Sequence, residues 1–204
     1  MRHPRHALLV LIFAALPALA QQTLLWGTPV NGLRIGLSQD TSGKPPSQTP
    51  ALRLSLHNVG TKDVTVILGA GCAQFGQLFQ SPNYVQLILT DSSGTSKRLV
   101  SLADSSCAGL VSIFYQTLRP GAMFSTPIML GDYWTAVRDN HGFWQPQTPL
   151  ERGWRPGVTY TLEADISHQP SQTPPLPASA TSGPFFWWVG TVTSNQLKVH
   201  TPAL

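Results

Sequence analysis

Hydrophobic and polar residues alternate with a period of two along most of this chain. The apolar positions are 33, 35 and 37 in "GLRIGLSQ", and 52, 54 and 56 in "ALRLSLHNVG". The alternation recurs in "DVTVILG" (63–69), "YVQLILT" (84–90) and, over the longest stretch, "VTYTLEADIS" (158–167). Such alternation is typical of antiparallel strands with one face in the core and the other in water. We therefore predict strands in these five segments, with Thr161, Glu163 and Asp165 on a solvated face.

Turn residues separate the predicted strands. Glycine or proline stands at 58–60, 91–94, 119–121 and 155–157, where glycine accepts positive φ and proline presets its own φ. Pro127, in "AMFSTPIML", cannot donate to a β-ladder, so its strand should lie at an edge or contain a bulge. The one helical candidate is a short turn at "DYWTAVRDN" (132–140). Many short strands between turns indicate a sandwich or a barrel with long loops at 41–50 and 167–184.

The last strand, in "PFFWWVGTVTSNQLKV" (184–199), contains a conflict of parity. Trp188 and Val192 share one face of a regular strand, whereas Leu197 and Val199 would lie on the other. One extra residue between 193 and 196, a β-bulge, brings all four into the core. We therefore predict a bulge there, with Trp188 as a core anchor and with Phe185 and Trp187 as the exposed rings.

Several of these segments resemble the bacterial immunoglobulin-like domains of secreted proteins. The resemblance lies in the strand–turn–strand "LRLSLHNVGTKDVTVILG", in the Pro-Gly approaches "LRPGAMFSTPIML" and "WRPGVTYTLEADI", and in the closing "FWWVGTVTSNQLKV". It implies an all-β, antiparallel immunoglobulin-like β-sandwich with no catalytic residues. It also implies that Tyr160 acts like a corner tyrosine whose hydroxyl bonds a nearby backbone group.

The N-terminus changes the picture by assigning a compartment. Residues 1–20 combine Arg2 and Arg5, an apolar stretch and Ala18-Leu19-Ala20, the pattern of a cleaved signal peptide. An uncleaved membrane anchor is the alternative, although the apolar stretch is short for a bilayer. We expect residues 21–204 to form one domain, exported to the periplasm or the exterior, with no membrane span after signal cleavage. Without Arg2 and Arg5, 11 of the 13 basic residues remain, against 9 acidic ones. Because this excess of positive charge is small, we expect no nucleic-acid partner.

Two cysteines, Cys72 and Cys107, are an even number in an exported chain, which predicts a disulfide. It would close a loop of about 36 residues and contribute roughly 3–4 kcal/mol by loop-closure entropy. Both cysteines are expected in loops, as a loop-to-loop staple. Free thiols or a redox site are the alternative, but no Cys-x-x-Cys spacing supports redox chemistry.

Catalytic motifs are sparse in the sequence. There is no Gly-x-Ser-x-Gly elbow and no closely spaced zinc-ligand set. Asp139 and His141 in "RDNHG" could form a base and its orienting acid, but the same residue types are ordinary turn material. We favour the turn, and we expect no enzyme activity, no metal and no cofactor.

Aromatic residues are frequent between residues 133 and 154, a loop-like region rich in Gly, Pro and Asn. Exposed rings stack on sugars or partner proteins, whereas buried ones would form a lid over one end of the sandwich. The candidate binding surface comprises Tyr133, Trp134, Phe143, Trp144, Trp154 and Trp187.

The sequence thus predicts an exported, non-enzymatic binding or structural module of the bacterial envelope or exterior, with an unidentified protein or polysaccharide partner. Two alternatives stay open. One is a carbohydrate-binding module that uses the loop aromatics, and the other is a small secreted hydrolase or protease inhibitor.

Overall fold

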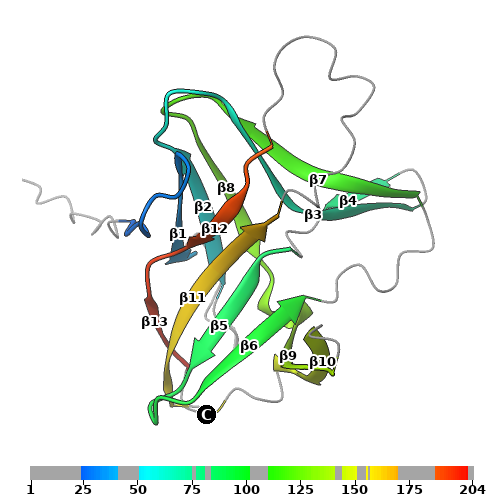
Figure 1. The fold of residues 1–204 in the computed structure, drawn as a ribbon. Helices are drawn as coiled ribbons and strands as arrows, with labels where there is room; N and C mark the ends of the chain where they lie inside the picture. Colours follow the sequence, from blue (N-terminus) through cyan, green and yellow to red (C-terminus); the bar gives the residue numbers. More distant parts are fainter. Residues whose placement is uncertain are drawn as a thin grey trace, which may run out of the picture.

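The structure is a computed structural model in which residues 24–40, 51–74, 77–80, 84–101, 110–140, 144–150, 155, 157–169 and 187–201 are described. These residues form antiparallel strands in three sheets (Figure 1). The all-β, antiparallel prediction is therefore confirmed, and the arrangement is compatible with a β-sandwich.

Each sheet brings together segments that are distant in the sequence. The first sheet has the order β1-β2-β8, with β1 at Leu33–Gln39, β2 at Leu52–Asn58 and β8 at Met123–Ile128. The third sheet has the order β4-β3-β7, with β3 at Val64–Gln74, β4 at Gln77–Gln80 and β7 at Leu110–Leu118. The large sheet has the order β10-β9-β6-β5-β11-β12, and β13 also pairs with β11. Its strands are β5 (Gln86–Thr90), β6 (Ser96–Ser101), β9 (Tyr133–Arg138), β10 (Trp144–Pro149), β11 (Thr159–His168), β12 (Gly190–Thr193) and β13 (Leu197–His200).

One hydrophobic core joins the three sheets. Inward positions predicted from the alternation are buried in it, among them Ile35 of β1, Leu68 of β3 and Leu162 of β11. Figure 1 shows the large sheet in front of the first sheet, with the third sheet extending to one side. Burial on one face of each strand is what the period of two requires.

The predicted bulge is confirmed. Thr193 pairs with Asp165 and Leu197 pairs with Leu162, so four steps from residue 193 to 197 match three steps along β11. Trp188, Val192, Leu197 and Val199 are all buried, at 4%, 0%, 9% and 0% exposure. The extra residue restores the inward parity, because a strand without it would expose one of the two apolar sets.

Asn195, inside the bulge, connects the large sheet to the first sheet. Its Oδ1 accepts the Leu37 N–H at 2.7 Å, and its Nδ2 donates to the Leu37 carbonyl at 3.1 Å. The side chain therefore occupies part of the open edge of β1 as a further strand would.

The Asn-x-Gly turn at 58–60 connects two sheets and does not close a hairpin, since β2 and β3 lie in different sheets. Asn58 is fully buried, and its Nδ2 donates to the carbonyls of Lys62 at 2.8 Å and Leu118 at 2.9 Å. Its Oδ1 accepts the Gly60 N–H at 2.9 Å. A buried amide with these partners fixes the corner at which β2 and β7 leave their sheets.

Two expectations about edges and corners are confirmed. β8, which contains Pro127, is an edge strand: among the described strands it pairs with β2 alone. The hydroxyl of Tyr160 accepts the backbone N–H of Arg155 at 3.0 Å.

Two local expectations are wrong. Residues 133–138 form strand β9 after a short 3₁₀ turn at Leu130–Asp132, because pairing with β6 and β10 overrides the weak helical pattern. Cys72 lies within β3 and not in a loop, since neighbours in β4 and β7 pair with it on both sides.

Candidate functional site

The large sheet has a solvent-side face, which we call the outer face. Leu87, Leu99 and Leu162 point into the core with 0% exposure. Side chains alternate along a strand, so residues an odd number of positions away from the leucine of their own strand point to the outer face. Arg98 and Asp165 are therefore outer-face residues.

The strand register brings the outer-face residues into rows that run across the strands. Ala136, Arg98, Ile88 and Glu163 form one row over β9, β6, β5 and β11. In the neighbouring row, Trp134 pairs with Val100, and Gln86 pairs with Asp165, which pairs in turn with Thr193. Gln86 and Val100 are adjacent by the same register, one step beyond the Leu87–Leu99 pair.

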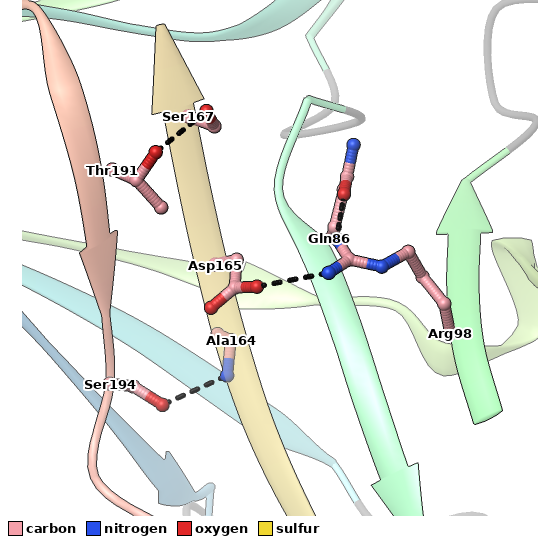
Figure 2. Close-up of polar contacts among 7 residues, drawn as sticks. All are labelled: Gln86, Arg98, Ala164, Asp165, Ser167, Thr191 and Ser194. Carbon is pink, nitrogen blue, oxygen red and sulfur yellow. Dashed lines mark hydrogen bonds and ion pairs between the residues drawn. The ribbon is translucent and has the colours of Figure 1, made fainter. Parts of the chain in front are cut away.

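Arg98 bridges Gln86 and Asp165 at the centre of this face (Figure 2). Its Nη1 donates to Gln86 Oε1, and its Nη2 lies 3.4 Å from Asp165 Oδ2. The side chains of Arg98 and Asp165 are only 25% and 12% exposed. Asp165 thus has the predicted outward parity, but it is not solvated as the sequence pattern predicted.

Asp165 also carries an unsatisfied acceptor. Its Oδ1 is buried and has no hydrogen-bond partner. A buried polar atom without a partner costs about 1–3 kcal/mol, and more when the group is charged. Such atoms are few in folded proteins and need a specific explanation. This carboxylate is the clearest local departure from a purely structural sheet.

Hydroxyl and amide groups lie on the β11–β12 side of the Arg98–Asp165 pair. Ser167 and Thr191 share a hydrogen bond of 2.9 Å across β11 and β12 (Figure 2). Gln196 Nε2 donates to Glu163 Oε2 at 3.2 Å. Ser194 accepts the Ala164 N–H at 2.9 Å, which anchors the bulge beside the pair. The outer face is therefore a set of positioned donors and acceptors.

Tyr133 does not belong to the predicted aromatic surface, because it is buried in the core. Tyr133 is 2% exposed, and its hydroxyl donates to the Val85 carbonyl at 3.0 Å. Burial, followed by the charge of Asp132, raises the pKa of Tyr133 far above its usual value. Tyr133 is thus a core residue, because its parity on β9 points it inward.

Trp134, the next residue, has the opposite parity and is half-buried on the outer face. Trp187 is half-buried elsewhere, and not exposed as predicted: it bridges to Thr65 of β3, and its ring lies edge-to-face with Tyr115 at 5.8 Å. Trp144 lies in β10, where only its backbone pairing with Arg138 is described. Phe143, Trp154 and Phe185 lie outside the described residues. Trp134 lies on the outer face, where the register pairs it with Val100 of β6.

The remaining candidate chemistry is only partly covered. Asp139 Oδ2 accepts a hydrogen bond from Gln145 at 2.9 Å, whereas His141 lies outside the described residues. Cys107 also lies outside them, so the Cys72–Cys107 disulfide stays a prediction. Among the described residues, no group of three His, Cys, Asp or Glu is arranged to hold a metal ion.

A second polar cluster lies on the first sheet. The Arg34 guanidinium stacks 4.8 Å from the Trp26 ring centre, and its Nε and Nη2 lie 3.1 and 2.9 Å from His57 Nδ1. Because an arginine is always a donor, Nδ1 accepts and the ring proton is on Nε2. Burial, and next the charge of Arg34, lowers the pKa of His57. The cluster attaches residues 24–30 to the sheet, and every polar group in it has a structural use.

The comparisons add no family to this description. No family model matches the chain, and neither the curated proteins nor the solved structures include a significant match. Where the structure is described, it has no helix of the length and hydrophobicity that a membrane crossing needs.

Sequence reasoning missed Gln86, Arg98 and the burial of Asp165. Arg98 and Asp165 are 67 residues apart, and each has the pattern of an ordinary outward residue in its own strand. The available signal was parity alone, which predicts the face of a residue but not its neighbours across the sheet.

Proposed function

We propose that this chain is an exported, non-enzymatic binding module with an immunoglobulin-like β-sandwich fold, and that the outer face of the large sheet is its binding surface. Its setting is the bacterial envelope or exterior. The export half of the proposal rests on the signal-like residues 1–20. The fold half is supported by the one-sided strands, the edge position of Pro127 and the Tyr160 hydroxyl bonded to the backbone of Arg155.

The observation that carries the binding role is the state of Asp165. A solvated sheet face needs no buried carboxylate, because exposed polar side chains satisfy themselves with water. Here an Arg–Asp pair is largely buried, and one carboxylate oxygen lacks a donor. Local violations of this kind are expected at functional sites rather than at structural ones.

A second Arg–Asp ion pair, on the first sheet, differs from the Arg98–Asp165 pair in distance and exposure. Arg53 and Asp40 lie 2.7 Å apart, with side chains 39% and 17% exposed. That pair has the normal distance of a charge-assisted hydrogen bond, and its arginine is more exposed than Arg98. Arg53 and Asp40 therefore provide a matched control of the same chemistry on another sheet.

The proposal is tested by capture of native envelope components on immobilised mature protein, residues 21–204. Arg98→Met and Asp165→Asn should each remove the material that the wild-type protein retains, whereas Arg53→Met should retain it. Circular dichroism and urea unfolding verify that each variant is folded. If wild type retains nothing, or if folded Arg98→Met retains the same components as wild type, the outer face is not the binding surface.

A further inference from the structure

We infer that the ligand of the outer face is an uncharged polysaccharide that lies across the strands. This inference rests on the proposed function, because it names the ligand class of the same surface.

The charges of the outer face favour a neutral ligand. At its centre Arg98 and Asp165 neutralise each other, and Glu163 accepts a hydrogen bond from Gln196. Hydroxyl and amide groups, among them the Ser167–Thr191 pair, lie on the β11–β12 side of this face, whereas Ile88 and Ala136 flank Arg98. Hydroxyl and amide groups both donate and accept, as sugar hydroxyls do. By strand parity the outer face also includes Arg138 and Lys198, so three basic groups stand against two acidic ones and the charges nearly balance. A strongly anionic or cationic partner would need a larger excess of one charge.

One aromatic ring lies on this face, and a second is exposed in the turn that precedes β5. Trp134 is half-buried on β9, and Tyr84, two residues before Gln86, is 48% exposed. A sugar ring presents C–H groups on its faces and hydroxyls on its edges. A row that contains an aromatic ring together with planar amide and carboxylate groups suits both parts at once.

The rows give the ligand a direction. The row from Trp134 to Thr193 crosses five strands, β9, β6, β5, β11 and β12. Neighbouring strands are about 4.8 Å apart, so the row is about 19 Å long. That length accommodates several linked sugar units and exceeds a single monosaccharide. An extended chain is therefore a better fit than a small metabolite.

A protein partner fits less well, because protein interfaces are centred on apolar anchors. Among the described residues, the large exposed aliphatic side chains lie off the outer face: they include Met123 on β8, Met129 after it, Ile113 on β7, and Val137, whose parity on β9 is opposite to that of Trp134. The centre of the outer face has a charged pair in their place.

Asp165 gives the inference its mechanism. Its Oδ1 is buried in the free protein, so a sugar hydroxyl reaches it only after the side chains around it rearrange. The Arg98–Asp165 contact of 3.4 Å is long compared with the roughly 2.7–2.9 Å of a charge-assisted hydrogen bond. A long contact is cheaper to exchange, and a ligand hydroxyl would then satisfy the oxygen that lacks a donor.

The test is affinity electrophoresis and calorimetry of the mature protein with a panel of soluble polysaccharides. The neutral probes are laminarin, xyloglucan, galactomannan and dextran, and the anionic probes are alginate and polygalacturonate. We expect binding to at least one neutral probe, with little dependence on salt. Trp134→Ala and Asp165→Asn should weaken it at least tenfold. The matched controls Trp187→Ala and Arg53→Met should stay within twofold of wild type.

Thr191→Lys keeps the test decisive if Trp134→Ala does not fold. Thr191 is exposed, so a lysine there leaves the core intact and should obstruct the face. Binding of a neutral probe that survives Thr191→Lys and Asp165→Asn overturns the inference. So does binding to anionic probes alone, or binding to none of the probes. If the protein binds only anionic probes or none of the probes, but its capture of envelope components still depends on Arg98, the proposed function stands and the polysaccharide inference is wrong. If that capture does not depend on Arg98 either, both the proposed function and the inference are wrong.

Discussion

Replacing Asn195 with alanine should destabilise the protein by releasing the edge of β1 from the large sheet. Asn195 makes two hydrogen bonds to the backbone of Leu37, at 2.7 and 3.1 Å. Leu37 is 1% exposed, so its backbone N–H has poor access to water once the amide is gone.

The magnitude follows from these contacts. A net hydrogen bond contributes about 1 kcal/mol, and a buried donor left unpaired costs about 1–3 kcal/mol. We therefore expect a loss of about 2–4 kcal/mol in the free energy of unfolding. For a chain of this length, each kcal/mol lowers Tm by about 2–4 °C, so the expected fall in Tm is about 4–16 °C.

Urea unfolding at 25 °C, followed by tryptophan fluorescence, measures the change, and the slope with urea should stay constant. Hydrogen exchange should show faster exchange of the Leu37 amide in the variant. Gln196→Ala is the control, because Gln196 is the exposed neighbour in the same bulge, and it should stay within about 0.5 kcal/mol of wild type. An Asn195→Ala variant as stable as Gln196→Ala, with Leu37 still protected, would refute the assigned role of the bulge.

Three further predictions use the same unfolding assay. Gly94→Ala should cost about 1 kcal/mol, because φ at Gly94 is +83° while the space around a new Cβ is open, so the cost is conformational only; a variant as stable as wild type would contradict this. Trp188→Phe should cost about 1–2 kcal/mol, since it leaves the Val30 carbonyl without the indole N–H now 3.0 Å away; an unchanged midpoint would count against that bond. The pKa of His57 is lowered in the folded protein, so as the pH decreases below about 6.5 the unfolded chain binds a proton at His57 before the folded chain does. The free energy of unfolding should therefore decrease as the pH is lowered, until the pH is below the folded pKa as well. His57→Gln should remove that part of the pH dependence, and an identical pH profile in the variant would show that His57 does not cause it.

The strands and their inward faces could be predicted from the sequence because the period of two is a local property. The bulge could be predicted for the same reason: Trp188 and Leu197 have opposite parity, and only an inserted residue reconciles them. Tyr133 shows the limit of local reading. Within "DYWTAVRDN" the alternation is too short to distinguish a strand from a turn, so the opposite orientations of Tyr133 and Trp134 depend on the pairing of β9 with β6.

The partners of the strands could not be predicted, because they depend on contacts between distant segments. The alternating segments on either side of Asn58 have the pattern of a hairpin, yet the side chain of Asn58 bonds Leu118, 60 residues away, and the two strands enter different sheets. The outer face is hidden for the same reason. Gln86, Arg98 and Asp165 become neighbours only when β5 lies between β6 and β11.

The two Arg–Asp pairs show why the distinction matters for function. Arg53 and Asp40 lie 2.7 Å apart, within the distance of a charge-assisted hydrogen bond, and Arg53 is 39% exposed. Arg98 and Asp165 are farther apart and less exposed, and Asp165 retains an oxygen with no donor. Desolvating an imperfect ion pair destabilises a fold, so stability gives no reason for the second arrangement. A ligand that supplies the missing donor does give one, because binding then recovers the free energy that the folded protein lacks at Asp165.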